Sequence, residues 1–353
     1  MRRKRFGIML SATCLALLCA CTPTGNNAGT PAPSTPAQPS TTPVATADAV
    51  EYPLTVTHAF GETVIASKPE NIVSISWGNQ DVPLALGVVP VGVSAANYGA
   101  VNEDGLHSWV GEKFAELGVE HPNVFNDTDG LDYEAISNAK PDVILAAYSG
   151  LTQEEYDLLS EIAPVVAYPR QAWQTFWREQ VTLNAAGMGM LAEGEALVAE
   201  TDALIQSKLA EHPVLEGKTA AFLYVNAADM GTFYIYLPSD PRASYLMDLG
   251  LALPDSVSAM AGPTDSFSLT VSAENTDQLD DVDIIVVYGD DALLDAMQAD
   301  KLMSQIPAVA NGAVVLLPDT SPLAAACNPT VLSIQSQLGE YLTQLDKAAS
   351  NIK

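Results

Sequence analysis

Aromatic side chains and a few arginines gather in short loops that follow apolar, strand-like runs of this sequence. The members of this candidate ligand-binding set are Trp77, Tyr98, Tyr148, Arg170, Trp173, Tyr234, Tyr236, Arg242 and Tyr288. Aromatic rings with a few cations suit a bulky ligand that is partly apolar and that is anionic or polarisable. We therefore expect non-covalent capture of such a ligand.

Residues that could perform covalent catalysis or hold a metal ion directly form no recognisable motif. The chain contains neither a Gly-rich phosphate loop nor a G-x-S-x-G elbow. Its four histidines (His58, His107, His121 and His212) are scattered and match no HExxH or Cys/His pattern. We expect a binding protein that is not an enzyme and has no cofactor. A surface hydrolase and a direct metal-ion binder are the alternatives from other classes.

The loops are positioned by strands that alternate with helices. Residues 71–78 form an apolar run, residues 79–87 resemble a helix capped by Asn79 and Asp81 and ended by Gly87, and residues 88–94 form the next run. Short connections between such elements predict a parallel pair of strands. Because ligands bind outside the carboxyl ends of strands in such sheets, the aromatic loops lie where a binding site is expected.

The same order of elements occurs twice. Glu134 and Tyr148 are fourteen residues apart, as are Glu274 and Tyr288, and each pair brackets a helix-like run followed by an apolar strand. Residues 173–212 between the two halves have helical composition and no strand signal. We predict an α/β fold with two pseudo-symmetric lobes, mostly parallel sheets and one long connecting helix, which permits only small hinge closure.

The first residues have the features of an export signal. Four basic residues precede an apolar stretch that is short for a membrane span, and Leu18-Cys19-Ala20-Cys21 resembles a bacterial lipoprotein signal. Cys21 would then carry lipid, and ordinary secretion is the alternative. Loss of Cys14 and Cys19 with the signal leaves Cys327 alone, so no disulfide is expected.

The composition of the following segment and the charge of the chain support this organisation. We predict a signal peptide at 1–20, a disordered lipid-anchored tether at 21–50 rich in Thr, Pro and Ala, an N-terminal lobe at 51–170, a connecting helix at 171–213 and a C-terminal lobe at 214–353. Four of the fifteen basic residues lie in the signal, so eleven remain against forty-three acidic residues, a net charge of about −32. This charge disfavours nucleic acid as a partner.

Several motifs together resemble the iron-siderophore substrate-binding lipoproteins of ABC importers. They are "HAFGETVIASKPENIVSISWGNQDVPLALGVVPVGVS", "AKPDVILAAYSG", "APVVAYP" followed by Trp173, and "DPRASYLMDLG". The resemblance covers the chain from Glu51 on and extends to the class that also holds ferric hydroxamate, haem and vitamin B12 binders. It implies a class III periplasmic-binding-protein-like fold, a monomer, a permease partner and a lipid anchor on the extracytoplasmic face of the cell membrane.

The resemblance assigns a docking role to one acidic residue on each lobe. Glu134 and Glu274 stand at the positions where related binders meet an arginine of the permease. The alternative is a local role, because each Glu lies in the first turn of a helix-like run, where the helix dipole stabilises it by roughly 0.3–1 kcal/mol.

The ligand implied by the resemblance is a ferric siderophore. Tyr148 stands where a ferric hydroxamate binder has a ligand-contacting Tyr, but "VFNDTDGLD" lacks the arginine that such binders carry there. Catecholate binders usually present several cations, whereas this sequence offers only Arg170, Arg242 and Arg178. We favour a hydroxamate siderophore. A haem or corrinoid ligand is the alternative, with Tyr148 or Tyr98 as an iron ligand.

Two arginines have local alternatives to ligand binding. Arg242 lies early in a predicted helix, where a salt bridge to Asp240 or Asp248 would also explain it. Arg178 lies in the connector, and we expect it to form an ion pair there.

Overall fold

The computed structural model describes residues 50–127 and 129–353. The chain divides after Ala49, and only the unit from Val50 onward is described below. The predicted signal peptide, the tether up to residue 49 and the lipidation site Cys21 lie outside the described residues. Within the described part, no helix is both long and apolar enough to cross a membrane.

The first sheet has five strands, all parallel, in the order β5-β4-β3-β6-β7. We call the part of the chain around it the first lobe. Its strands and helices are β3 (Ile72–Ser74), β4 (Gly92–Ser94), β5 (Val124–Phe125), β6 (Val143–Ala146), β7 (Val165–Ala167), α1 (Asp81–Ala85), α2 (Ser108–Glu116), α3 (Tyr133–Asn138) and α4 (Gln153–Ser160). An antiparallel pair, β1 (Leu54–His58) and β2 (Gly61–Ile65), lies beside it. The central strands are buried on both faces, which explains their continuous apolar sequences.

The second sheet also has five strands, in the order β10-β9-β8-β11-β12, and the part of the chain around it is the second lobe. β8, β11 and β12 are parallel, whereas β9 runs antiparallel to both β8 and β10. The strands are β8 (Ala220–Asn226), β9 (Asp229–Tyr236), β10 (Ser268–Ser272), β11 (Ile284–Tyr288) and β12 (Val314–Leu317). The helices are α7 (Pro241–Asp248), α8 (Asp255–Ala261), α9 (Asp291–Ala299), α10 (Pro307–Asn311), α11 (Pro322–Ala326) and the 3-10 turns η1 (Pro213–Leu215), η2 (Ala273–Gln278) and η3 (Met303–Gln305).

The predicted α/β fold with two lobes and mostly parallel sheets is confirmed, and the repeat holds for three of the five strands in each sheet. The strands β3, β6 and β7 correspond to β8, β11 and β12 in order and direction. The counterpart of β4 is reduced to one parallel bridge between Thr219 and Ala252, and the antiparallel strands β9 and β10 complete that side of the second sheet. The run after Glu274, predicted as a helix, is the 3-10 turn η2.

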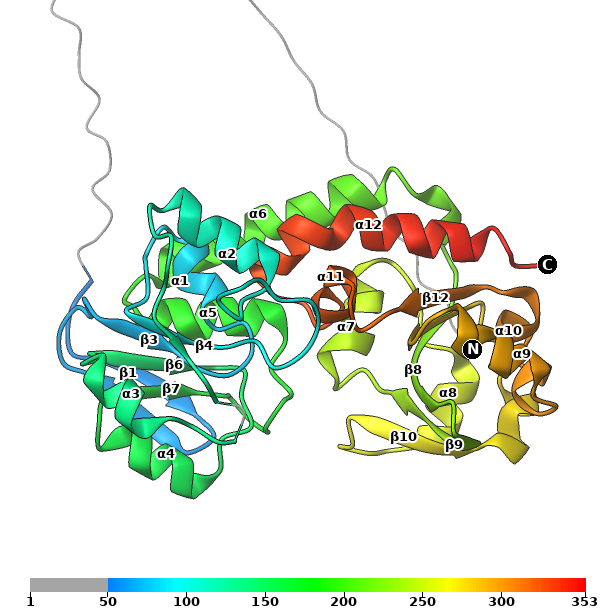
Figure 1. The fold of residues 1–353 in the computed structure, drawn as a ribbon, viewed down its shortest axis with the longest axis horizontal. Helices are drawn as coiled ribbons and strands as arrows, with labels where there is room; N and C mark the ends of the chain where they lie inside the picture. The colour runs from blue at the N-terminus through cyan, green and yellow to red at the C-terminus, as the bar shows by residue number, and fades with distance from the viewer. Residues whose placement is uncertain (1–49, 128) are drawn as a thin grey trace, which may run out of the picture. The chain divides into compact units, whose positions relative to one another are not determined.

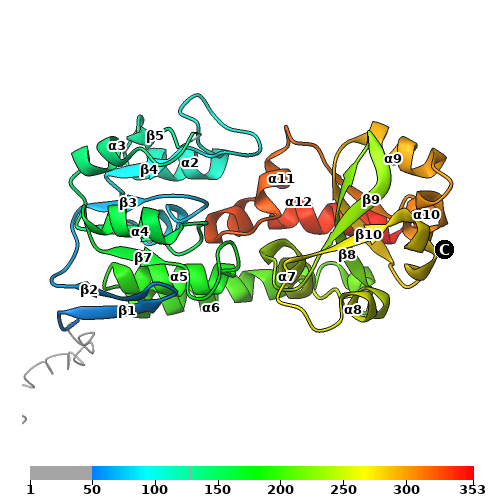
Figure 2. The same cartoon turned by 90° about the horizontal axis from the view of Figure 1, so that it is seen from below.

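The segment predicted as one connecting helix contains two helices, α5 (Trp177–Gly187) and α6 (Leu191–Leu209). The break falls at Gly189, whose φ of +69° is incompatible with a continuing right-handed helix. α5 packs against strands of the first sheet, and α6 continues toward the second lobe beside the C-terminal helix α12 (Val331–Ala349) (Figures 1 and 2). Two adjacent helices, α6 and α12, therefore join the lobes, and we expect them to permit only small closure.

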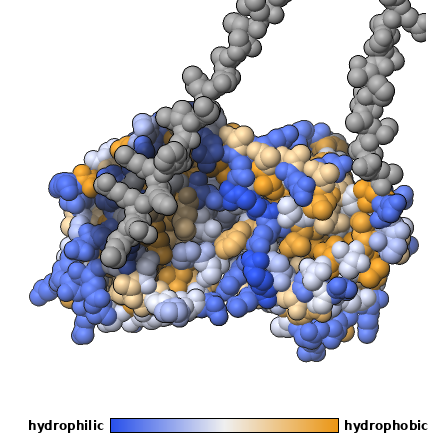
Figure 3. Space-filling view, turned by 180° about the vertical axis from the view of Figure 1, so that it is seen from behind, coloured by the Kyte–Doolittle hydropathy of each residue, from blue (hydrophilic) through white to orange (hydrophobic). Residues whose placement is uncertain are grey.

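One of the three apolar clusters in the described part of the chain extends across this junction. It contains residues of the first sheet such as Leu145, residues of the second sheet such as Phe222, and the inward face of α12 with Leu342. The connector is fixed by Arg178, which pairs with Asp202 on α6 at 2.5 Å and with Asp248 on α7 at 2.9 Å, as predicted for a connector ion pair. Outside this core, hydrophilic residues form a band down the middle of the face shown in Figure 3.

Candidate functional site

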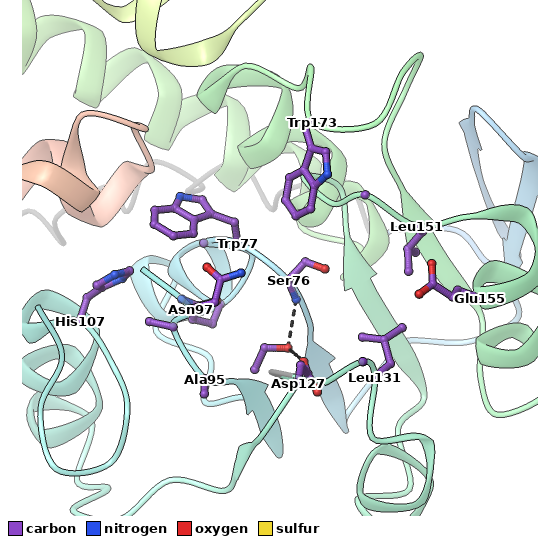
Figure 4. A pocket seen from close by; sticks show the side chains of 16 residues that line it. Ser76, Trp77, Ala95, Asn97, His107, Asp127, Leu131, Leu151, Glu155 and Trp173 are labelled. Atoms are coloured by element: carbon purple, nitrogen blue, oxygen red, sulfur yellow. Dashed lines mark hydrogen bonds between the residues drawn. The ribbon is translucent and has the colours of Figure 1, made fainter. Parts of the chain in front are cut away.

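The carboxyl ends of the first-lobe strands surround a cavity of about 210 Å³ (Figure 4). We call it the first cavity. Its walls come from the loops after β3, β4, β5 and β6, together with Trp173. The side chains that line it include Trp77, Gln80, Asn97, His107, Asp127, Leu131, Leu151, Glu155 and Trp173.

The backbone of the first cavity is strained at two points. Ser76 and Trp173 are two of the three non-glycine residues with positive φ in the described chain, at +64° and +61°. Such a conformation is an outlier for a bulky residue and costs on the order of 1–3 kcal/mol. The Trp173 amide donates to the Ser149 carbonyl at 3.0 Å, which holds the ring over Gly150. Both strained residues line the cavity, so the strain marks a place where ligand contact is expected.

A series of hydrogen bonds connects three residues that line the first cavity. The Ser76 amide donates to Ser94 Oγ at 3.0 Å, and Ser94 Oγ donates to Asp127 (Figure 4). Burial raises the pKa of Asp127, while the hydrogen bonds from Ser94 and from the Asp132 amide act in the opposite direction. A carboxyl group is therefore held at the edge of a cavity that the two indoles line.

Asn79 fixes the strand ends behind this cavity. Its Nδ2 donates to the carbonyls of Ile75 and Tyr148 at 2.7 and 3.0 Å, and its Oδ1 accepts from the Tyr148 amide at 3.1 Å. Gln180 and Asn184 on α5 also donate to Oδ1. The prediction that Asn79 caps a helix is wrong, because the side chain is fully buried and joins β3, β6 and α5 instead.

The second lobe contributes an aromatic cavity of about 270 Å³, the second cavity. Its lining residues are Tyr98, Tyr224, Tyr236, Arg242, Tyr288 and Asp319. Tyr98 comes from a first-lobe loop, and its hydroxyl donates to Asp319 at 2.8 Å while its ring meets Tyr288 edge-on at 5.4 Å. Residues of both lobes therefore build this cavity.

Arg242 is the cation of the second cavity, and its charge is already paired. Its Nε and Nη2 donate to the two carboxylate oxygens of Asp240 at 2.8 and 2.7 Å, and its guanidinium lies 3.8 Å from the centre of the Tyr236 ring. Burial alone would lower the pKa of Arg242, but the hydrogen bonds and charge of Asp240 raise it above its usual value. The salt-bridge alternative to Asp240 is thus observed, within a cavity-lining position.

Direct contacts join the lobes between the two cavities. Trp77 Nε1 donates to the Asn328 carbonyl at 3.3 Å, and Asn328 Nδ2 donates to the Tyr148 hydroxyl at 3.2 Å. Tyr148 also meets the Trp173 ring edge-on at 5.4 Å. Burial raises the pKa of Tyr148, so its hydroxyl stays neutral near pH 7. These contacts place the aromatic residues of both lobes around one region.

Seven of the nine predicted ligand-binding residues lie in this region, and the other two, Arg170 and Tyr234, lie away from it. Trp77 and Trp173 line the first cavity, Tyr98, Tyr236, Arg242 and Tyr288 line the second, and Tyr148 contacts Trp173. Arg170 instead forms a bidentate ion pair with Glu179 on α5 at 2.6 and 2.8 Å. Tyr234 is 41% exposed because β9 turns Phe233 and Ile235 into the core, so Tyr234 points to the other face.

Sequence reasoning missed several lining residues. Tyr224 lies inside β8 rather than in a loop, and Asp127, Asp319 and Gln80 are polar residues in a chain rich in such side chains. The signal that was available is position, since Asp127 and Asp319 each follow the carboxyl end of a strand.

The two docking candidates are exposed at the starts of short helical elements. Glu134 lies in the first turn of α3, and Glu274 lies in the first turn of η2. Neither carboxylate forms an ion pair with another described residue. α3 and the strand β10 that leads to Glu274 lie on the side of the molecule opposite α6 and α12 (Figure 1).

Comparison with known proteins agrees with this geometry. PiaA of Streptococcus pneumoniae TIGR4, solved in complex with ferrichrome, is 48% identical and superposes with a TM-score of 0.81, covering 85% of this chain and 100% of that one. The ferric enterobactin-binding periplasmic protein FepB of Escherichia coli O6:H1 (strain CFT073) is 25% identical over 295 residues, which are 78% of this chain and 86% of FepB. SirA of Staphylococcus aureus, complexed with staphyloferrin B, shares the fold at 21% identity and a TM-score of 0.63, covering 82% of this chain and 98% of that one. The model of the family described as periplasmic binding protein matches residues 72–320, and the chain belongs to this family.

Proposed function

We propose that this protein is the substrate-binding component of an ABC importer and that it captures a ferric siderophore of the hydroxamate type between its two lobes. The candidate ligand contacts are Trp77, Trp173 and Tyr148 from the first lobe and Tyr236, Arg242 and Tyr288 from the second, with Tyr98 between them. The mechanism is non-covalent capture, small closure of the lobes and delivery to a permease.

The ion pairs of the arginines are the observation that favours a hydroxamate over a catecholate ligand. All three arginines in the described chain are paired with carboxylates: Arg170 with Glu179, Arg178 with Asp202 and Asp248, and Arg242 with Asp240. No lysine lines either cavity. A trianionic ferric catecholate would therefore enter a strongly negative molecule without a free cation to receive it. A neutral or cationic ferric hydroxamate meets no such penalty, and the ferrichrome complex of PiaA supports this class.

The alternatives fit the described residues less well. Direct iron ligation of haem by a tyrosine requires a free hydroxyl, but the Tyr98 hydroxyl is bonded to Asp319 and the Tyr148 hydroxyl to Asn328. Among the residues that the structure describes, no group of three His, Cys, Asp or Glu side chains is arranged to hold a metal ion. Haem, a corrinoid and ferric ion alone are therefore included as competing ligands in the titration described below.

Delivery of the ligand requires contact with the permease and attachment to the membrane. Exposed carboxylates on both lobes support Glu134 and Glu274 as the groups that meet the permease. We also propose that Cys21 anchors the chain through lipid to the extracytoplasmic face of the cell membrane and that the protein acts as a monomer.

Tryptophan fluorescence tests the ligand class. The purified protein would be titrated with ferrichrome, a trianionic ferric tris-catecholate, haem, a corrinoid and ferric ion alone. We expect saturable quenching by ferrichrome, because Trp77 and Trp173 line the first cavity, whereas Trp109 and Trp177 are buried in the core. Trp173→Phe should reduce the signal. A flat response to ferrichrome, or tighter binding of the catecholate or of haem, would contradict the proposal.

A further inference from the structure

The first cavity carries negative charge and no cationic side chain among the described residues that line it. Asp127 and Glu155 both line it. The third titratable group is His107, whose Nε2 donates to the Tyr98 carbonyl at 2.9 Å. Burial lowers the pKa of His107, so this imidazole is neutral near pH 7. The cavity is therefore electrostatically matched to a cation.

The Asp127 carboxyl group is held in place rather than free to turn into solvent. It accepts from Ser94 Oγ through Oδ2 and from the Asp132 amide through Oδ1 at 3.4 Å. Ser94 is fixed in turn by the Ser76 amide. Figure 4 shows Asp127 across the cavity from the Trp173 ring. A cation in the cavity would thus meet a positioned carboxylate on one side and an indole on the other.

Gln80 gives a second, independent reason to expect a hydrogen-bond donor in the first cavity. It lines the same cavity, is 5% exposed, and its buried Oε1 has no hydrogen-bond partner among the described residues. A buried acceptor without a partner typically costs roughly 1–3 kcal/mol. A hydrogen-bond donor on the ligand would remove that cost, and an ammonium group offers three N–H donors.

The size of the cavity limits what it can hold. Its volume of about 210 Å³ is below the roughly 300–1,000 Å³ of sites that enclose a drug-sized ligand. A complete ferric trihydroxamate is larger than this, so the cavity suits one arm of the ligand. Trp77 and Trp173 in the wall favour a cationic arm, because the face of an indole attracts positive charge.

We propose that the first cavity binds a protonated amine on the ligand, so that the protein prefers ferric hydroxamates with a free ammonium arm over uncharged ones. Asp127 receives the charge, Gln80 Oε1 accepts an N–H, and the indoles cover the arm. This inference rests on the proposed function, since it concerns which hydroxamate the same site selects.

Two forms of one ligand test it. The first is a linear ferric trihydroxamate that ends in a primary amine, and the second is the same complex with that amine acetylated, which removes the charge and keeps the iron centre. We expect the wild-type protein to bind the amine form about tenfold more tightly, a gain typical of one charge-assisted hydrogen bond. Equal affinity, or tighter binding of the acetylated form, would overturn the inference.

A matched pair of variants locates the effect. Asp127→Asn should bring the affinity ratio of the two forms close to one. Asp129→Asn removes the same charge two residues away, at an exposed position outside the lining of the cavity, and should keep the ratio. A ratio that Asp127→Asn leaves unchanged also overturns the inference. The wild-type comparison decides it even if Asp127→Asn fails to fold. If neither form binds at all, the proposed function has failed, whereas equal binding of both forms defeats only this inference.

Discussion

Trp173 sits in a left-handed backbone conformation, and its indole packs directly against a glycine. A Cβ added to Gly150 would lie 2.3 Å from Trp173 Nε1, so the ring occupies the space that any other residue would fill. Gly150 itself has no positive φ, and alanine is compatible with its backbone. The glycine is therefore needed for the position of the ring.

Gly150→Ala should displace the Trp173 ring and weaken ferrichrome binding by about tenfold, a loss of about 1.4 kcal/mol. Isothermal titration calorimetry measures it. The control is Gly339→Ala in α12, where an added Cβ meets nothing within 4 Å. That variant should keep its affinity and gain roughly 0.5–1 kcal/mol of stability. Wild-type affinity in Gly150→Ala would show that the ring makes no ligand contact.

Asp81 is a fully buried acid at the junction of the first lobe and α12. Thr330 Oγ1 donates to its Oδ2, and burial raises its pKa to about 7 despite the opposing hydrogen bonds. Below the ordinary pKa of 3.8 both the folded and unfolded chains hold the proton. Between that value and about 7 only the folded chain holds it, so this group's contribution to stability falls as the pH rises and levels off above 7.

Asp81→Asn should remove this fall, because the amide does not titrate. Between pH 5 and pH 7.5 the variant should gain about 2 kcal/mol in free energy of unfolding relative to the wild type. Urea unfolding at several pH values gives the comparison, with Asp295→Asn on the exposed face of α9 as the control. Parallel pH profiles for the wild type and Asp81→Asn would show that Asp81 does not titrate in this range.

At the scale of residues, the sequence predicted several aromatic rings that line the two cavities but not the polar residues beside them. Trp77 and Tyr288 follow apolar strands, and that position predicts a place at the binding edge. The partners of Arg170 depend on how α5 packs, and the buried contacts of Asn79 depend on three elements meeting. A single sequence carries no signal for such contacts between elements that are distant along the chain.

Elements with strong local signals were predicted well. Thr152 forms a capping box at the start of α4, and Asp240 caps α7 with Pro241 at its first position. The errors arose where tertiary packing overrides local preference. The connector breaks at Gly189, the antiparallel strands β9 and β10 stand where the first sheet has parallel strands, and α12 reaches back to the first lobe through Thr330.

The docking role that we propose for Glu134 and Glu274 depends on the elements that present them, α3 and η2. Glu134→Arg combined with Glu274→Arg should abolish siderophore uptake in cells and leave the ferrichrome affinity of the purified protein within about twofold, because both residues lie outside the cavities. Uptake of a radiolabelled ferric siderophore measures the first effect, and calorimetry measures the second.

A control with the same change of charge separates docking from the helix dipole. Glu154 in the first turn of α4 and Asp291 in the first turn of α9 are also exposed. Their double substitution by arginine should keep uptake. Equal loss of uptake in both double variants would refute the docking assignment, since any first-turn charge reversal would then have the same effect.

The whole molecule joins two lobes through a continuous core and two adjacent helices. Gly78 of the first lobe approaches Thr330 at the start of α12 so closely that a Cβ would lie 2.2 Å from the Thr330 methyl group. We expect such packing to restrict the lobes to small relative motion. We therefore expect the binding region to be largely preformed and its selectivity to depend on charge and shape at the edges of the two sheets.

A crystal structure of the protein with ferrichrome tests the central claim most directly. We predict one iron complex between the lobes, with Trp77 or Trp173 of the first lobe and Tyr236 or Tyr288 of the second in contact with the same ligand molecule. A ligand held by one lobe alone, or bound away from both cavities, would contradict this account.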